Sequence, residues 1–184
     1  MLIITATYTE AAPIIEALQL EKVATKPFRI YAASHIQLLI TGIGMLNAAI
    51  ATASLLTNDQ KKAVFNIGYA AADNVGILYN ITKVIDGCSK SIYHLSQSNT
   101  LPNAACTTLC HPATTPHKTL VDMEASAIVR CARVYNIPVK ILKIGSDRFN
   151  PKSFQKNNNL IRKHIDTILS QIELQLQKNI QGKV

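Results

Sequence analysis

The sequence lacks the features that place a chain in a membrane or in an oxidising compartment. Its four cysteines among 184 residues are too few for the disulfide framework of a small secreted domain. Met1 is followed by apolar residues rather than by a basic segment, so we expect no secretory signal. No apolar run approaches the ~20 residues that span a bilayer. We therefore expect a reduced, cytoplasmic protein with no membrane partner.

Charged residues are also sparse. They make up 16% of the chain against 48% apolar residues, which excludes disorder over most of the length and supports a sizeable core. The net charge of +8 would suit a nucleic-acid-binding protein. However, residues 148–184 alone carry seven lysines and arginines against two acids, and the helix expected there has no aromatic residues between its charges to stack on bases. We interpret this segment as a solvated helix face and expect no nucleic-acid partner.

Short β-branched runs alternate with longer amphipathic stretches, which is typical of strands flanked by helices. Strands are expected near residues 2–6, 29–33, 36–41, 63–67, 77–85, 104–108 and 139–144. Helices are expected after a Thr9 N-cap, from Gly44 to Leu56, over 122–135 and over 157–179. No repeat or linker interrupts the chain. This order predicts a single α/β domain over residues 1–184, with three layers (α/β/α) around a central mixed, twisted sheet.

Three of the eleven acidic residues fall where a strand ends or a helix begins. Glu10 follows the first strand, Glu124 falls in the first turn of a helix, and Asp147 follows the last strand. Ligands of such sheets bind beyond the carboxyl ends of the strands. Any one of these acids could instead cap a helix or face solvent, but together they are candidates for one site.

Longer motifs surround these acids. Val121-Asp-Met-Glu-Ala-Ser-Ala127 is followed by Ile137-Pro-Val-Lys-Ile-Leu-Lys-Ile-Gly-Ser-Asp147, and Leu39-Ile-Thr-Gly-Ile-Gly44 and Phe65-Asn-Ile-Gly68 precede both. Over residues 2 to 150 the chain resembles the purine nucleoside phosphorylase-like superfamily, and within it the 5′-methylthioadenosine/S-adenosylhomocysteine nucleosidases. The Met-Glu-Ala and Ser-Asp pair at this spacing is the more specific part of the resemblance.

The resemblance implies hydrolysis of the N-glycosidic bond of a purine nucleoside, which could be modified at the 5′ position as in methylthioadenosine. Glu124 would accept hydrogen bonds from the two ribose hydroxyls, and Met123 would pack against the sugar. Asp147 would protonate the purine ring as the bond breaks, and Glu10 would activate the attacking water.

The same resemblance assigns four further residues to substrate binding: Gly68, Tyr69, Lys143 and Ser146. Lys143 lies at a position where the nucleosidases have an arginine. The positive charge is kept, but the planar guanidinium group with its paired hydrogen-bond donors is lost. The family also implies a homo-oligomer, either a dimer or a hexamer, and a small-molecule nucleoside as the partner.

Two alternatives stay open: a nucleoside phosphorylase and a catalytically silent nucleoside-binding protein. Glu10 beside the sugar would repel a phosphate dianion, and no arginine lies in residues 1–28, so we favour water as the nucleophile. Tyr69 replaces a small hydroxyl residue of the family, and it could narrow the pocket or point away. The stretch between Thr108 and Leu120 is also shorter than in the family. These two departures favour the silent alternative.

A zinc site is an alternative interpretation of the segment from Cys106 to His117. Cys106, Cys110, His111 and His117 are suitable ligand types, but their spacing matches no closed four-ligand pattern. We expect no metal and no cofactor, and interpret the segment as a loop near the substrate.

Overall fold

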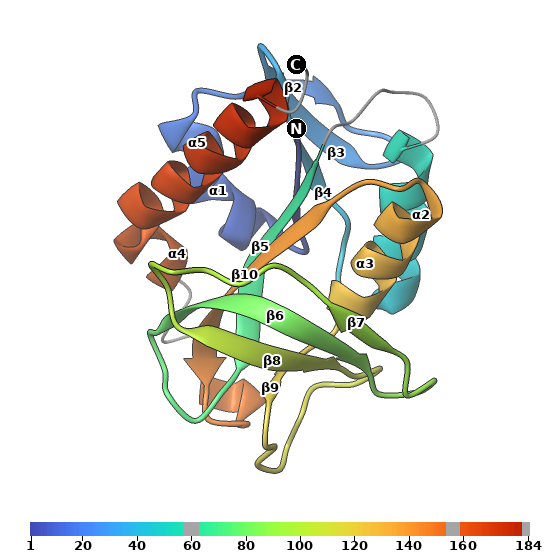
Figure 1. Ribbon diagram of the computed structural model, residues 1–184, viewed down its shortest axis with the longest axis vertical. Helices are drawn as coiled ribbons and strands as arrows, with labels where there is room; N and C mark the ends of the chain where they lie inside the picture. The colour runs from blue at the N-terminus through green and yellow to red at the C-terminus, as the bar shows by residue number, and fades with distance from the viewer. Residues whose placement is uncertain (57–62, 154–158, 182–184) are drawn as a thin grey trace.

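The computed structural model describes residues 1–56, 63–153 and 159–181 (Figure 1). The strands are β1 (Leu2–Thr5), β2 (Glu21–Ala24), β3 (Arg29–Ala33), β4 (Ile36–Ile40), β5 (Val64–Ala71), β6 (Leu78–Asp86), β7 (Ile92–His94), β8 (Asn103–Thr108), β9 (Leu120–Asp122) and β10 (Val139–Asp147). The helices are α1 (Tyr8–Ala17), α2 (Met45–Leu56), α3 (Ala125–Val134), α4 (Leu160–Lys163) and α5 (Ile165–Gln181).

All ten strands belong to one mixed sheet. Its centre is parallel, in the order β4, β1, β5 and β10, and β3 and β2 extend it as antiparallel strands at one edge. At the other side β10 pairs with β6, β6 with β8, β8 with β9, and β9 returns to β5. The lower half of Figure 1 shows β6, β8 and β9 crossing below β5 and β10. The pairing therefore closes a five-strand ring next to the open part of the sheet.

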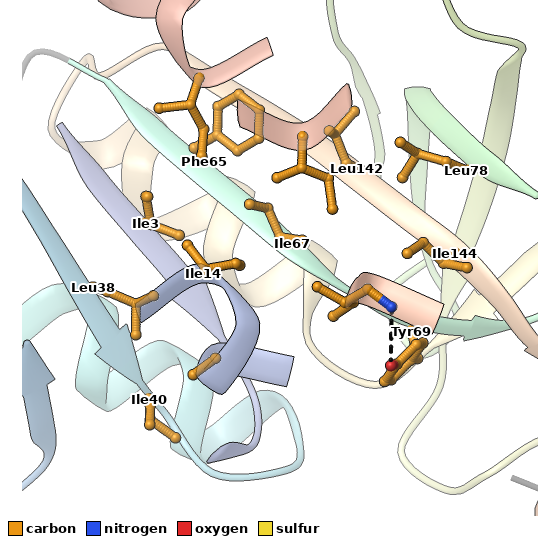
Figure 2. Packing of buried hydrophobic residues seen from close by; sticks show 14 of the residues in the cluster. Ile3, Ile14, Leu38, Ile40, Phe65, Ile67, Tyr69, Leu78, Leu142 and Ile144 are labelled. Atoms are coloured by element: carbon orange, nitrogen blue, oxygen red, sulfur yellow. Dashed lines mark hydrogen bonds between the residues drawn. The ribbon is translucent and has the colours of Figure 1, made fainter. Parts of the chain in front are cut away.

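Alternating side chains of the central strands build two cores on opposite faces of the sheet. Ile3 and Phe65 pack with side chains of α1 and α5, as Figure 2 shows for the strand residues. Leu2 and Val64, their neighbours in sequence, pack on the other face with α2 and α3. The predicted three-layer α/β/α fold with a mixed central sheet is confirmed. Within the described ranges no helix is long and apolar enough to cross a membrane.

Several predicted boundaries were wrong. The N-cap of α1 is Thr7 rather than Thr9, and its side chain accepts the amide of Glu10. Asp122 ends strand β9 rather than opening a helix, so α3 begins at Ala125 with Glu124 in the N-cap position. β5 runs past Gly68 to Ala71, and β10 includes Asp147.

The closing helix also differs from the prediction. It is divided at His164 into α4 and α5, and the first residues of the predicted range lie outside the described residues. Strands β2, β7 and β9 were not predicted. They are short, and β2 and β7 lie mostly exposed at edges of the sheet, so they carry little hydrophobic pattern.

Substitutions at two residues of α5 can test how this helix packs against the sheet. Ile168 is fully buried, whereas Leu174 is 45% exposed. We expect Ile168→Ala to lower the free energy of unfolding by about 2–5 kcal/mol, because it leaves a cavity against the sheet. Leu174→Ala should change it by less than about 0.5 kcal/mol. Urea denaturation of both variants measures this, and equal losses would contradict the packing.

Candidate active site

A pocket of about 230 Å³ opens where the parallel strands β1, β5 and β10 end. Six of the eight predicted site residues line it: Glu10, Tyr69, Met123, Glu124, Ser146 and Asp147. The other two, Gly68 and Lys143, are buried behind the lining residues Glu10 and Asp122. The residues singled out in the sequence therefore gather around one cavity, although they come from segments far apart in the chain.

Glu10 is fixed by the start of α1. Its Oε2 accepts the amides of Ala6 (2.9 Å) and Thr7 (2.8 Å) and the Thr7 hydroxyl (3.1 Å), which forms a capping box with the threonine. Its Oε1 accepts the amide of Tyr69 at 3.0 Å. A carboxylate offers about four lone-pair sites, two on each oxygen, so Oε1 keeps acceptor capacity for a ligand. The spacing Thr7-x-x-Glu10 was the sequence signal for this cap.

Gly68 allows β5 to approach that oxygen. A Cβ atom at this position would lie 2.8 Å from Oε1 of Glu10 and 3.5 Å from Nζ of Lys143. Real Cβ atoms do not approach an oxygen that closely, so a side chain here would displace the carboxylate. Gly68 thus allows the carboxylate of Glu10 to lie directly against β5, near Lys143.

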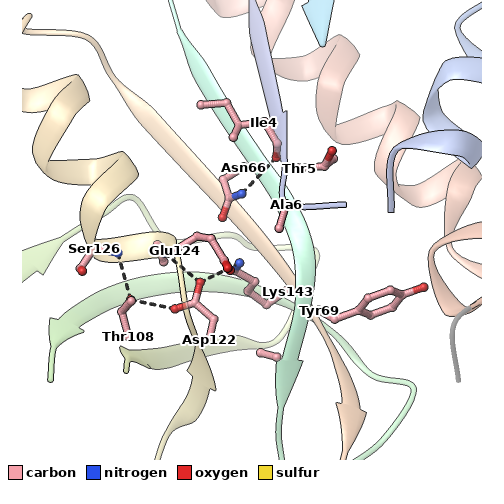
Figure 3. Close-up of polar contacts among 12 residues, drawn as sticks. Ile4, Thr5, Ala6, Asn66, Tyr69, Thr108, Asp122, Glu124, Ser126 and Lys143 are labelled. Carbon is pink, nitrogen blue, oxygen red and sulfur yellow. Dashed lines mark hydrogen bonds and ion pairs between the residues drawn. The ribbon is translucent and has the colours of Figure 1, made fainter. Parts of the chain in front are cut away.

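Lys143 forms a buried ion pair that sequence reasoning missed. Its Nζ lies 2.8 Å from Oδ2 of Asp122, and both side chains are almost completely buried. Asp122 also accepts the Thr108 hydroxyl (2.7 Å) and the Ala125 amide (2.8 Å). Burial lowers the pKa of Lys143, but attraction to Asp122 and Glu124 outweighs it and raises the pKa above its ordinary value. The acids around it therefore favour the protonated form of Lys143, which lies beside Asp122 and Glu124 in Figure 3.

Glu124 receives its support from a distant turn. Its Oε1 accepts the amide of Gly44 at 2.8 Å, and Gly44 has a φ of +99°, which favours glycine. Although Glu124 stands at the N-cap of α3, its side chain makes no capping bond, so the carboxyl group faces the pocket. Burial, with Asp122 adding to it, raises its pKa from 4.5 to about 7. The group therefore changes charge near neutral pH.

Asp147 ends β10, where a bulge follows Gly145. Its Oδ2 accepts the hydroxyl of Ser146 at 2.9 Å, and its Oδ1 accepts the amide of Asn150 at 3.0 Å. These two bonds orient the carboxyl group in the wall of the pocket.

The sequence matches no protein-family model and no curated protein. Solved structures are similar. The apo form of a 5′-methylthioadenosine nucleosidase from Arabidopsis thaliana has a TM-score of 0.82 at 16% identity, with 93% of this chain and 94% of that chain covered. A nucleosidase for methylthioadenosine and adenosylhomocysteine from S. pneumoniae was solved with a transition-state inhibitor. It has a TM-score of 0.79 at 17% sequence identity, with 91% of this chain and 96% of that chain covered. A variant of the Chlamydia trachomatis nucleosidase has a TM-score of 0.75 at 22% sequence identity, with 92% of this chain and 97% of that chain covered.

The chain has the fold of these nucleosidases. The fold implied by the sequence motifs is thereby confirmed, while the roles of the individual residues stay predictions.

Within this nucleosidase fold the side chain of Tyr69 points away from the pocket. Figures 2 and 3 show its ring directed into the core, where its hydroxyl oxygen accepts the amide of Ile161 at 3.3 Å. Burial raises the pKa of Tyr69 to about 12. At the pocket Tyr69 contributes its backbone amide, which binds Glu10. Of the two possibilities left open for this residue, pointing away is the correct one.

The shortened loop remains at the pocket. Pro112 and Ala113 line it, and Ala113 packs against Val121 and Phe149. The structure places this segment at the cavity, while its closeness to a substrate stays a prediction. Cys106 is buried in β8 whereas Cys110 is exposed, and no three potential metal ligands gather among the described residues.

The raised pKa of Glu124 predicts a pH dependence of stability. The folded protein holds a proton that the unfolded chain has released, so Glu124 makes the free energy of unfolding fall as pH rises from about 4.5 to about 7. Above that range its contribution is constant. This fall is absent in Glu124→Gln. The difference in free energy of unfolding between the two proteins should therefore change by on the order of 2–3 kcal/mol over this pH range. Urea denaturation across this range measures it, and a difference independent of pH would refute the assignment.

Proposed function

We propose that this chain hydrolyses the N-glycosidic bond of a purine nucleoside, with Asp147 as general acid and Glu10 as the group that activates water. The observation that carries the proposal is the meeting of three carboxyl groups, Glu10, Glu124 and Asp147, around one cavity of about 230 Å³. The likeness in fold to the methylthioadenosine and adenosylhomocysteine nucleosidases supports the same reaction class.

The base would lie beside Asp147. The pocket there is bounded by apolar side chains, among them Ala71, Ala113 and Val121, which suit the faces of a planar ring. Departure of an anionic purine is difficult, so protonation of the ring by a positioned acid contributes about 10²–10⁴-fold. Ser146 and the Asn150 amide hold the acid in place for that transfer.

The ribose would lie between Glu124 and Met123. An ionised carboxylate accepts hydrogen bonds from both hydroxyls of a vicinal diol, and the thioether of Met123 packs against the sugar. Because the pKa of Glu124 is about 7, riboside binding should strengthen as pH rises through neutrality. The carboxyl groups around the sugar also stabilise the positive charge of an oxocarbenium-like transition state.

Water suits the nucleophile position better than phosphate. Glu10 lines the pocket, and its Oε1 retains acceptor capacity for a water molecule. Among the described residues that line the pocket there is no lysine or arginine, and Lys143 behind them is paired with Asp122. A phosphate dianion would meet the carboxylate of Glu10 without a free cation to balance it.

A silent nucleoside-binding protein is the second candidate. The capping box of α1 would by itself account for Glu10, because it satisfies the orphan amides of the helix start. The same pocket would then bind a riboside without cleaving it.

We also propose that the chain forms a homo-oligomer through the start of α2. Leu46 and Ile50 lie one helical turn apart and are 73% and 53% exposed, and Ile43 beside them lines the pocket. A second copy covering this face would reach the site. Leu46→Asp should therefore lower the mass measured by light scattering to that of a monomer, and an unchanged mass would contradict this interface. The cytoplasmic location stays a prediction.

Base release tests the reaction. A panel of adenosine, inosine, methylthioadenosine and adenosylhomocysteine should release its base without phosphate. Asp147→Asn and Glu10→Gln should each lower the rate by about 10²-fold or more. Glu16→Gln is the matched control, since Glu16 lies on the same helix, is exposed and pairs with Arg162 on the surface.

The two candidates and the phosphorylase differ in this assay. Release that requires phosphate would identify a phosphorylase. Folded protein that binds ribosides but releases no base would identify the silent protein.

A further inference from the structure

Two exposed cysteines lie in contact outside the pocket. The sulfur atoms of Cys88 and Cys110 are 3.0 Å apart, and both residues are exposed. The remaining cysteines differ from them, because Cys106 is fully buried and Cys131 is partly buried with its thiol directed to the carbonyl of Ala49. Nothing in the reaction proposed above uses the exposed pair.

The sheet register brings the two thiols together. Parallel strands β6 and β8 pair Asp86 with Thr108, and each cysteine lies two residues beyond its paired residue. Gly87 makes this approach possible, since a Cβ there would lie 2.6 Å from Cδ2 of Leu109 and 2.7 Å from the carbonyl oxygen of Thr108. Its amide instead donates to that carbonyl at 2.9 Å. The two strand ends are thus held at close range by backbone pairing.

The turn that carries Cys88 is also well ordered. Oδ1 of Asp86 accepts the amides of Cys88 (2.9 Å) and Ser89 (2.8 Å), and its Oδ2 accepts the hydroxyl of Ser126 on α3 at 3.1 Å. The amide of Lys90 closes the turn on the carbonyl of Asp86. Cys88 therefore meets Cys110 from a fixed position, and a reaction between them loses little chain entropy.

We infer that Cys88 and Cys110 form a reversible dithiol–disulfide pair. With a small organic disulfide as oxidant, the thiolate of one cysteine attacks it and releases one small thiol. The second cysteine then displaces the other half, so that one S–S bond forms in the protein and two small thiols leave with the electrons and protons. The sulfurs need to approach by only about 1 Å to reach the length of a disulfide bond.

This bond would act on the loop at the pocket. Cys110 lies two residues before Pro112, which lines the cavity together with Ala113. The disulfide would tie the start of that loop to the turn after β6, and reduction would release it. Bond formation itself does not depend on the proposed hydrolysis, so the two can fail separately.

Peptide mapping after incubation with oxidised glutathione tests the pair. Trypsin separates the two cysteines into peptides 84–90 and 91–118. We expect these peptides to be joined, with the intact protein lighter by two hydrogen atoms and the link lost on reduction. Cys106→Ser should keep the link, because Cys106 shares the second peptide but is buried.

Cys110→Ser should abolish the link and leave a glutathione adduct on Cys88. The wild-type disulfide should withstand at least about tenfold more reduced glutathione than this adduct, because its partner thiol is held at high effective concentration. Separate glutathione adducts on Cys88 and Cys110 in the wild-type protein, a link through Cys131, or no reaction would each overturn the inference.

Discussion

The ion pair between Lys143 and Asp122 lies behind a pocket whose wall carries the carboxyl groups of Glu10, Glu124 and Asp147. Several acids in a largely buried space repel one another, and burial alone disfavours their ionised forms. The lysine balances the charge of Asp122, which lines the same pocket, and attracts Glu124. Removing one partner of such a buried pair costs about 3–5 kcal/mol, because the other charge is left uncompensated. The buried position of Asp122 therefore depends on this pair.

Three neighbouring residues, Gly68, Thr108 and Ala125, hold these charged side chains in position. Gly68 leaves room for the carboxylate of Glu10 beside β5, and the hydroxyl of Thr108 and the amide of Ala125 satisfy the oxygens of Asp122. With Lys143 committed to Asp122, the pocket keeps a negative character. That character favours a cationic sugar-like transition state and disfavours a bound phosphate, so one arrangement supports both the proposed bond cleavage and the choice of water.

Much of the fold could be predicted from the sequence because the central strands of the sheet are buried on both faces. β1, β4 and β5 are mostly apolar, with Gln37 and Asn66 among the exceptions, and Glu10 and Asp147 lie at the carboxyl ends of parallel strands, at one edge of the sheet. The ring that β5, β6, β8, β9 and β10 form could not be predicted, since β9 has only three residues and the pairing that closes the ring is with β5, which is distant in sequence. The site was found through motifs around Glu124 and Asp147. Asp122 was missed because its role comes from Lys143, which approaches it only in the folded sheet.

The central claim is that water held by Glu10 attacks the sugar while Asp147 protonates the base. The most direct measurement is the origin of the new oxygen on the ribose. Cleavage is run in oxygen-18 water containing ordinary phosphate, and the sugar is reduced at once with borohydride so that its oxygen cannot exchange. The account predicts ribose carrying one heavy oxygen and no ribose phosphate. Ribose 1-phosphate with ordinary oxygen, or no released base, would contradict it.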